Sequence, residues 1–324
     1  MEKRRLGNGP LVGSIGFGCM GMSEFYGATD DEQSLATLEH AFASGVTFFD
    51  TADIYGFGHN ESLLGRFLRG KRDELVIATK AGIVRSKEDP ALRGVDNSAA
   101  YLAQHCDASL ARLGTDRVDL YYLHRIDPAT PLEDSIAALA KLKTAGKIRG
   151  IGLSNVKLET IRAAHRIHPI TAVQNEFSLF TRNDQSTLIP ALRDMGIAYV
   201  PYSPLGRGML TGALVAQALP ADDFRRNLPR FADEAMSRNA RLVAALQEIA
   251  GERGVTPAQV ALAWVLGQGP HVIPIPGTKR IRFLDENLAA ADVALTGAEI
   301  IKLQQIFDPD AVQGEPYPDM SFLR

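Results

Sequence analysis

The chain has 324 residues, of which 45% are hydrophobic and 23% are charged, as is typical of a globular protein with a large buried core. Its 35 basic and 38 acidic residues give a formal net charge of −3, without the basic block that nucleic acid would favour. No stretch has the roughly 18 uninterrupted apolar residues of a membrane span, and the N-terminus lacks the apolar region of a signal peptide. We therefore expect a cytoplasmic protein that binds neither nucleic acid nor a membrane.

Strand-like and helix-like segments alternate along the chain. A turn signal at residues 6–10 indicates an N-terminal β-hairpin, and eight short strands are expected after it, at Ile15–Phe17, Val46–Phe49, Val76–Thr79, Leu120–Leu123, Ile151–Leu153, Val173–Glu176, Ala198–Pro201 and Val272–Ile275. Helical spacing of apolar residues occurs between them, at Gln33–Ser44, Ala99–Leu113, Leu132–Ala145, Leu158–Ile167, Thr187–Met195 and Asn239–Leu266. This alternation, without a Pro/Gly/Ser-rich linker, predicts an α/β fold in which residues 1–324 form a single (β/α)8 TIM barrel domain.

Two stretches are longer than the connections that such a barrel needs. One is the loop 206–237 after the seventh strand, and the other is the tail after Phe307. Loops of this length in a compact domain are usually functional lids or disordered. The first loop carries Phe224, Leu228 and Phe231 among arginines, which favours a partly ordered flap over the alternative of a solvated excursion.

Four reactive side chains lie where predicted strands end. Asp50, Lys80 and His124 each follow an apolar strand directly, and Tyr55 lies in the loop just after Asp50. In a barrel of parallel strands, the C-terminal strand ends converge on one mouth, where such folds place their chemistry. Three successive strands that end in ionisable residues therefore predict one assembled site.

These four residue types can deliver a proton to an oxygen that gains negative charge. A tyrosine has an ordinary pKa of about 10, and a nearby ammonium such as that of Lys80 would lower the pKa of Tyr55 by favouring the phenolate. The carboxylate of Asp50 would keep Lys80 charged. His124 can donate a hydrogen bond to a substrate oxygen and orient it toward the tyrosine.

The remaining strand ends are also polar. They are Ser154 and Asn155 after strand five, Gln174 and Asn175 at strand six, Tyr202 and Ser203 after strand seven, and Gly277 and Thr278 after strand eight. Amides suit a carboxamide, a tyrosine ring suits stacking on another ring, and the basic Lys279, Arg280 and Arg282 suit a phosphate. Together they predict a nucleotide that carries a carboxamide. Ser154 and Asn155 have a second interpretation as the N-cap of the helix 158–167, and both interpretations can hold.

At these motifs the chain resembles the aldo/keto reductase superfamily. The motifs run in order between about Leu6 and Ala290, and several are specific when taken together: Phe49-Asp50-Thr51-Ala52-Asp53-Ile54-Tyr55-Gly56, Ala78-Thr79-Lys80, Tyr122-Leu123-His124-Arg125-Ile126-Asp127, Gly152-Leu153-Ser154-Asn155, Gln174-Asn175-Glu176 and Tyr202-Ser203-Pro204-Leu205-Gly206-Arg207-Gly208. The chain most resembles the bacterial and plant members, whose loop after strand seven is similar to residues 224–231.

The resemblance implies a (β/α)8 barrel that binds NADPH in extended form and reduces an aldehyde or ketone without a metal. It assigns Tyr55 as the general acid, Lys80 and Asp50 as its tuning partners, and His124 as the donor that orients the carbonyl. The coenzyme contacts that we expect on this basis and from the strand ends are Met20, Asp50, Ser154, Asn155, Gln174, Tyr202, Ser203, Leu205, Arg207, Gly208, Leu210, Gly277, Thr278, Lys279, Arg280, Arg282, Glu286 and Asn287.

The chain departs from the family pattern at the adenosine end. Better-known members carry a lysine at the position of Gly277 and an arginine at that of Phe283, and both contact the 2′-phosphate. Here Lys279, Arg280 or Arg282 must take that role if NADPH is preferred.

The substrate mouth is expected to be aromatic or apolar, which suits a carbonyl compound with an apolar or aromatic body. Its candidate residues are Tyr26, Tyr55, His124, Ile126, Phe224 and Phe231.

Competing hypotheses depend on other features. Residues 16–21 match the dinucleotide fingerprint G-x-G-x-x-G, but a helix is expected only after Asp30 or Asp31, so a Rossmann fold is rejected. Lys80 as a Schiff-base nucleophile would need a neutral lysine, which a nearby Asp50 disfavours. No third residue has suitable spacing to form a metal site with Asp50 and His124. A cofactor-binding regulatory subunit with little turnover remains the alternative from a different functional class.

Overall fold

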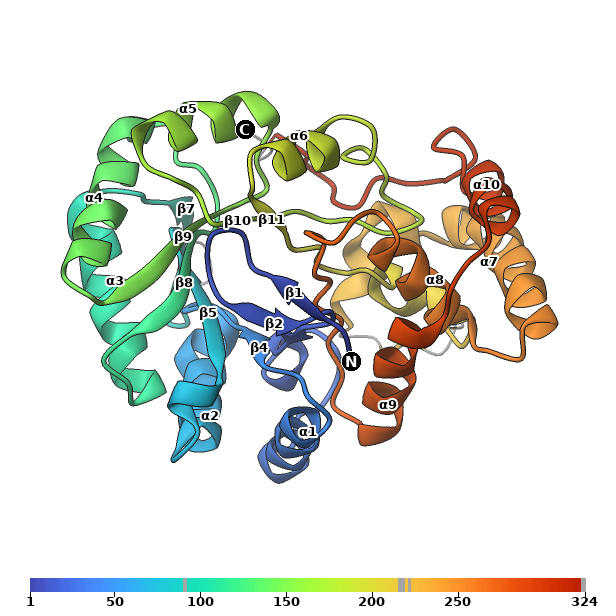
Figure 1. Ribbon diagram of the computed structural model, residues 1–324, viewed down its shortest axis with the longest axis horizontal. Coiled ribbons are helices and arrows are strands. Elements are labelled where there is room, and N and C mark those ends of the chain that lie inside the picture. Colours follow the sequence, from blue (N-terminus) through green and yellow to red (C-terminus); the bar gives the residue numbers. More distant parts are fainter. Residues whose placement is uncertain (90–91, 215–218, 221–222, 322–324) are drawn as a thin grey trace.

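The computed structural model describes residues 1–89, 92–214, 219–220 and 223–321, and its centre is a curled sheet of parallel strands (Figure 1). The order of its strands is β11-β10-β9-β8-β5-β4-β3, and each neighbouring pair is parallel. The strands are β3 (Phe17–Gly18), β4 (Phe48–Asp50), β5 (Val76–Ala81), β8 (Val118–Leu123), β9 (Ile148–Ser154), β10 (Ala172–Gln174) and β11 (Ala198–Tyr199).

An irregular segment, 272–276, closes this sheet into a barrel. On one side, Ile273 N donates to Tyr199 O at 2.8 Å, and on the other, Gly16 N donates to Pro274 O at 2.9 Å. The segment therefore lies between β11 and β3, where the eighth strand is expected. Pro274 and Pro276 lack an N–H group, so the segment cannot form a regular ladder, and only an isolated bridge joins it to β11. The predicted (β/α)8 barrel is confirmed, and its eighth member is irregular.

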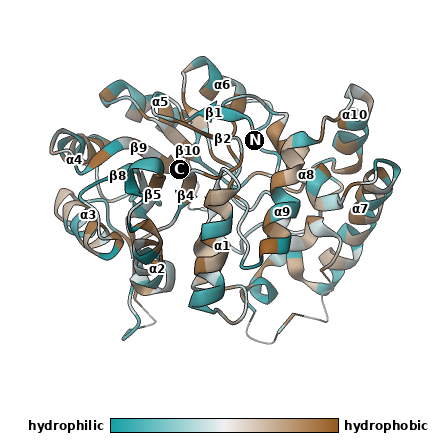
Figure 2. Cartoon of the chain, turned by 60° about the horizontal axis from the view of Figure 1, so that its bottom comes forward, coloured by the Kyte–Doolittle hydropathy of each residue, from teal (hydrophilic) through white to brown (hydrophobic). Residues whose placement is uncertain are grey.

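Helices surround the barrel, and Figure 2 shows them carrying both hydrophobic and hydrophilic residues. They are α1 (Asp31–Ala43), α2 (His59–Leu68), α3 (Ala99–Leu113), α4 (Leu132–Thr144), α5 (Leu158–Ile167), α6 (Leu188–Asp194), α7 (Asp233–Glu252), α8 (Pro257–Leu266), α9 (Ile281–Ala289) and α10 (Gly297–Ile306). Helix α1 begins after the N-cap Asp30, ten residues beyond the glycine fingerprint, so the rejection of a Rossmann nucleotide turn is confirmed.

The expected helical segment 239–266 is in fact two helices. Helix α7 ends at Glu252, and Gly254 follows with a left-handed φ of +65°. Thr256 and Gln259 then form a capping box that starts α8, with Pro257 in its first turn. These start and stop signals lie inside a nearly continuous run of apolar spacing. That spacing alone therefore overestimated the length of the helix.

A hairpin closes the N-terminal end of the barrel, as expected. Strands β1 (Lys3–Arg5) and β2 (Leu11–Gly13) are antiparallel, and their connection places Leu6 and Val12 against the barrel interior. A second hairpin, of β6 (Ile83–Arg85) and β7 (Arg93–Val95), follows β5.

Side chains alternate between the barrel interior and the helix layer. Phe48, Ala78 and Tyr122 belong to the interior cluster, whereas their neighbours Phe49 and Tyr121 pack toward the helices. This period of two is the ordinary consequence of a β-strand backbone.

Gly152 should not tolerate a side chain, because it faces the ring of Tyr122. A Cβ atom at Gly152 would lie 2.2 Å from Cδ1 of Tyr122, whose side chain is fully buried. We expect Gly152→Ala to lower the free energy of unfolding by about 1–3 kcal/mol, measured by urea denaturation. Gly251→Ala is the matched control, since no atom lies within 4 Å of its Cβ position in α7, and it should cause no loss.

The long loop after β11 is folded onto its surroundings where it is described. It contains the short 3-10 helices η4 (Gly206–Thr211), η6 (Phe224–Asn227) and η7 (Pro229–Phe231). The rings of Phe224 and Phe25 lie 4.9 Å apart, and Arg225 Nη1 donates to Arg207 O at 3.0 Å. A partly ordered flap therefore fits better than a solvated excursion. Residues 215–218 and 221–222 of this loop lie outside the described residues.

Candidate active site

The barrel alternation brings the predicted site residues to one end of the interior. Asp50, Lys80 and His124 each lie two residues after an interior side chain, namely after Phe48, Ala78 and Tyr122, so they share the inward orientation. By the same spacing of two, Gln174 shares the inward orientation of Ala172, and Tyr202 shares that of Val200. The predicted convergence of these strand ends follows from the strand register.

Lys80 is the centre of a buried hydrogen-bond network. Its Nζ donates to the Asp50 carboxylate, to Thr51 O at 2.7 Å and to Tyr55 Oη at 3.4 Å, and its side chain has no exposed surface. The rings of Tyr55 and His124 meet edge to face, with centroids 5.9 Å apart. The four predicted catalytic residues therefore form one connected group, in which Lys80 contacts Asp50 and Tyr55, and Tyr55 contacts His124.

Burial has the dominant effect on the proton affinity of these groups. It raises the pKa of Tyr55 well above the ordinary value, and the carboxylate of Asp50 adds to that rise. Burial, assisted by the nearby Lys80, lowers the pKa of His124 well below its usual range. The net shift is opposite to the lowering expected from Lys80, because burial has the largest effect on the Tyr55 pKa. Tyr55 thus holds its proton at neutral pH, and His124 is neutral.

The lowered pKa of His124 should couple stability to pH. The unfolded chain takes up the imidazole proton near pH 6.5 and the folded protein does so only at lower pH, so stability falls as pH drops below about 6.5. One such proton contributes a slope of at most about 1.4 kcal/mol per pH unit. We expect His124→Gln to have a shallower fall between pH 7 and 5 in urea denaturation. Parallel curves for the two proteins would contradict this.

A second buried group lies beside the first, at the ends of β9 and β10. Asn155 Nδ2 donates to Ser154 Oγ at 2.7 Å, and Asn155 Oδ1 accepts from Tyr202 Oη at 2.8 Å. Gln174 Nε2 donates to Asp50 Oδ2 at 2.7 Å, which joins this group to the Lys80 network. The alternative in which Ser154 and Asn155 cap α5 is wrong, because the N-cap is Lys157 and no side chain caps it.

Backbone strain is concentrated in the loops at this end of the barrel. Among the described residues, the non-glycine positions with positive φ are Phe25, Phe57, Asn155, Ser203 and Arg207. Each follows the C-terminal end of a barrel strand. Strain of this kind costs about 1–3 kcal/mol per residue and clusters at functional sites.

Arg207 is held by a carboxylate that the sequence did not single out as a site residue. Its Nη2 lies 2.8 Å from Oε2 of Glu176, and both side chains are buried. Glu176 stands in a strand-end motif two residues after Gln174, which is the signal that could have identified it. Arg230 lies 3.9 Å from the same carboxylate.

The basic cluster at the adenosine end is only partly as predicted. Lys279 Nζ donates to the carbonyl oxygens of Tyr26 and Ala28, each at 2.7 Å, so its ammonium is already used to hold that loop. Burial lowers the pKa of Lys279, and the nearby Arg280 lowers it further. Arg280 and Arg282 are exposed and lie over the ring of Phe283, at 5.9 and 4.9 Å.

Gly277 has a steric reason to differ from the lysine of better-known family members. A Cβ atom at this position would lie 2.5 Å from Gly18 O, because β3 and the segment 272–276 approach closely there. No side chain fits without a shift of the backbone.

The other predicted coenzyme residues lie in helix α9 and in segments that follow barrel strands. Met20 lies in the 3-10 helix η1 (Met20–Met22) after β3, and Asn287 is buried in α9. Leu205, Gly208 and Leu210 lie in or beside η4. The remaining ones are Ser203 after β11, Thr278 before α9, and Glu286 within α9.

The predicted substrate residues separate into two groups. Tyr26 and Phe224 lie in the two loops that meet over the mouth, where Arg225 sits 5.3 Å above the ring of Tyr26. Ile126 is partly buried beside His124 in the chain. Phe231, in contrast, is buried in the main core with only 6% exposure.

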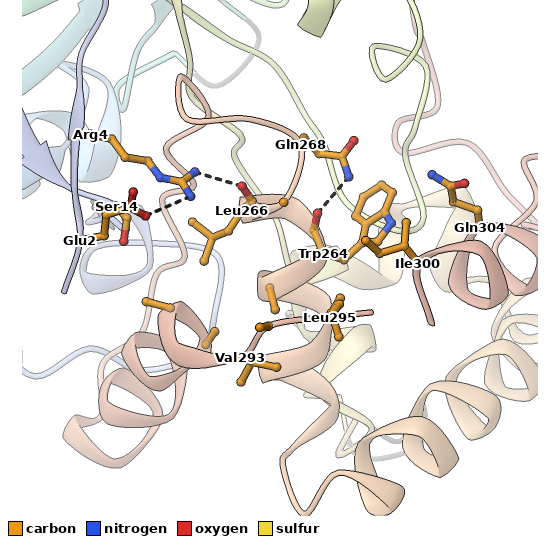
Figure 3. Close-up of a pocket in the computed structure, with 15 residues that line it drawn as sticks. Glu2, Arg4, Ser14, Trp264, Leu266, Gln268, Val293, Leu295, Ile300 and Gln304 are labelled. Atoms are coloured by element: carbon orange, nitrogen blue, oxygen red, sulfur yellow. Dashed lines mark hydrogen bonds and ion pairs between the residues drawn. The ribbon is translucent and has the colours of Figure 1, made fainter. Parts of the chain in front are cut away.

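A separate cavity of about 490 Å³ lies away from this mouth (Figure 3). Arg4 and Ser14 lie at one end and Trp264, Ile300 and Gln304 at the other, and none of the predicted site residues lines it.

Across the described ranges, no group of three or more His, Cys, Asp or Glu side chains could hold a metal ion. No helix in the described part of the chain is long and apolar enough to cross a membrane.

Comparisons with known proteins agree with this geometry. Residues 14–308 match the model of the Aldo/keto reductase family. The chain is 42% identical over 321 residues to the aldo-keto reductase yakc (NADP(+)) of Schizosaccharomyces pombe, covering 97% of this chain and 94% of that protein.

Solved structures are similar as well. The glycerol dehydrogenase AKR11B4 of Gluconobacter oxydans superposes with a TM-score of 0.87 at 28% identity, covering 98% of each chain. An aldo/keto reductase of Klebsiella pneumoniae in complex with NADP and acetate superposes with a TM-score of 0.75 at 29% identity, covering 95% of this chain and 96% of that one. With its barrel, its buried Asp-Tyr-Lys-His group and this family match, the chain belongs to the aldo/keto reductase family.

Proposed function

We propose that this protein reduces an aldehyde or ketone to the alcohol with NADPH, with Tyr55 as the proton donor. The observation that carries the proposal is the buried contact of Tyr55 Oη with Lys80 Nζ, at 3.4 Å, beside the ring of His124. Such an arrangement places a protonated hydroxyl and a neutral imidazole at the same point of the mouth. A carbonyl oxygen can accept a hydrogen bond from both.

The residues at the mouth fit a nicotinamide coenzyme. Asn155 Nδ2 and Ser154 Oγ offer a buried donor and hydroxyl to a carboxamide. Gln174 offers its amide oxygen as an acceptor, since its amide nitrogen donates to Asp50. Tyr202 offers a ring for stacking, and Arg207 offers a cation for the pyrophosphate. Two relatives support the phosphorylated coenzyme, since yakc carries NADP(+) in its name and the Klebsiella enzyme was solved with NADP.

The chain's own residues then handle the proton. When bound, NADPH would provide the hydride for the carbonyl carbon. His124, neutral because of its lowered pKa, donates a hydrogen bond that orients the carbonyl oxygen toward Tyr55. Tyr55 gives its proton to that oxygen as negative charge develops on it. The ammonium of Lys80 stabilises the phenolate that remains, and Asp50 holds that ammonium in place.

A regulatory subunit that only binds coenzyme could keep the same four residues, so a turnover assay separates this alternative from the proposed function. The network does disfavour Schiff-base chemistry at Lys80, because the Asp50 carboxylate and Thr51 O both stabilise the ammonium form. Phe25, Tyr26 and Phe224 at the mouth suit a carbonyl compound with an apolar or aromatic body.

A turnover assay with isotopic transfer tests the proposal. Purified protein is mixed with a panel of aldehydes and ketones and with NADPH that is deuterated at the 4-position of its nicotinamide. We expect coenzyme oxidation with at least one apolar or aromatic carbonyl, and deuterium on the carbinol carbon of the product. Tight NADPH binding without oxidation by any member of a broad panel would favour the regulatory subunit. Covalent trapping of Lys80 by borohydride would instead indicate an aldolase.

A further inference from the structure

The C-terminal tail, residues 308–321, returns from α10 toward the barrel (Figure 1) and is anchored there. Asn239 Nδ2 donates to Gln313 O at 2.9 Å, and Gln313 N donates back to Asn239 Oδ1 at 3.0 Å. Gly314, with φ +81°, packs so closely that a Cβ atom would lie 2.6 Å from Arg230 Cα. The backbone is therefore fixed three residues before Tyr317.

From this anchor, Tyr317 reaches the carboxamide group of the candidate site. Its Oη lies 3.3 Å from Tyr202 Oη. The hydroxyl proton of Tyr202 is used on Asn155 Oδ1, which can only accept, so Tyr317 must donate to Tyr202. A directed chain of hydrogen bonds therefore runs from Tyr317 through Tyr202 and Asn155 to Ser154.

The ring of Tyr317 makes a separate contact with Arg207. The guanidinium carbon lies 4.7 Å from the ring centroid, within the range of a cation–π interaction. The hydroxyl of Tyr317 thus contacts the residues proposed for the carboxamide, and its ring contacts Arg207, which is proposed for the pyrophosphate. The two contacts can be separated, since phenylalanine keeps the ring and loses the hydroxyl.

We propose that Tyr317 is a positioning residue for the nicotinamide. Its hydroxyl fixes Tyr202 and, through Tyr202, orients the Asn155 side chain so that Nδ2 faces the carboxamide oxygen. This inference rests on the proposed function, in which Asn155 binds the carboxamide. The amide of Asn155 is held at both of its atoms, since Oδ1 accepts from Tyr202 Oη at 2.8 Å and Nδ2 donates to Ser154 Oγ at 2.7 Å.

The consequence is specific to one part of the coenzyme. Losing one neutral hydrogen bond that orients a ligand should weaken NADPH binding by roughly two- to tenfold. The thionicotinamide analogue of NADPH should lose less, because its sulfur is a weaker acceptor than oxygen for Asn155 Nδ2. The fragment 2′,5′-ADP, which lacks the nicotinamide, should not respond at all.

The test measures dissociation constants of NADPH, thio-NADPH and 2′,5′-ADP for the wild type, Tyr317→Phe and Asn155→Ala. Tyr101→Phe is the matched control, because its hydroxyl donates to Ile83 O at 3.2 Å, outside the site. We expect Tyr317→Phe to weaken NADPH more than thio-NADPH and to leave 2′,5′-ADP unchanged. In the Asn155→Ala background, Tyr317→Phe should add no further loss.

Three results would overturn the inference, and they separate its causes. An unchanged NADPH affinity in Tyr317→Phe, with a clear loss in Asn155→Ala, rejects the hydrogen-bond chain while leaving the carboxamide assignment intact. An equal loss of NADPH and 2′,5′-ADP shows that Tyr317 acts on the phosphate side only. If Asn155→Ala itself leaves NADPH affinity unchanged, the carboxamide assignment of the proposed function is wrong, and the inference falls with it.

Discussion

Replacing Tyr55 with phenylalanine is expected to lower kcat by about two orders of magnitude or more, while NADPH still binds. Among the described residues, Tyr55 carries the one hydroxyl that contacts Lys80 Nζ, and the substitution removes it while leaving the ring beside His124. No other protonated group in this contact can take its place, since His124 is neutral and Lys80 is held by Asp50. The loss should appear in single-turnover measurements, which report the chemical step directly.

Tyr121→Phe serves as the matched control for this experiment. Like Tyr55, Tyr121 is a buried tyrosine. It lies on strand β8 and its side chain faces the helix layer, where its hydroxyl donates to Leu102 O at 3.2 Å. It should keep the wild-type kcat. A Tyr55→Phe variant with near-wild-type turnover would remove Tyr55 from the role of proton donor, whatever its position in the network.

The barrel and the clustering of Asp50, Lys80 and His124 at one end of it could be predicted because both follow from simple periodicities. Apolar runs of three or four residues marked most strands, and polar residues at the ends of strands two to eight marked the mouth. Since side chains alternate with a period of two, Asp50, Lys80 and His124 inherit the inward direction of Phe48, Ala78 and Tyr122. The sequence alone therefore predicts that these three side chains point to the same end of the barrel interior.

Other features depend on contacts that no local pattern encodes. The irregular eighth member of the barrel results from Pro274 and Pro276, which lie within an apolar run that resembles a strand. The role of Tyr317 depends on the path of the tail, and that path is fixed by Asn239 and Arg230 from elsewhere in the chain. The net shift of the Tyr55 pKa is upward rather than downward, because burial, followed by the charge of Asp50, has the largest effect on it, and no apolar or polar pattern in the sequence measures burial.

Coenzyme preference should depend on Arg280 and Arg282 rather than on Lys279. A 2′-phosphate brings nearly two negative charges to the adenosine end, and these two guanidinium groups are exposed beside Phe283 at the start of α9. Lys279, in contrast, already donates to backbone carbonyls of the loop 26–28. We therefore expect NADPH to bind more tightly than NADH, with the discrimination carried by the arginines.

The test compares dissociation constants of both coenzymes for Arg280→Ala, Arg282→Ala and Lys279→Ala, each made singly. A charge-assisted hydrogen bond contributes about 1.5–3 kcal/mol, so at least one arginine variant should lose roughly ten- to a hundredfold in NADPH affinity with NADH nearly unchanged. The loss should shrink at high salt, since both groups are exposed to solvent. Lys279→Ala should instead weaken both coenzymes to a similar extent, because it releases a loop rather than a phosphate contact. If all three variants keep the wild-type ratio of NADPH to NADH affinity, this cluster is only a solvated helix start and another part of the chain must bind the phosphate.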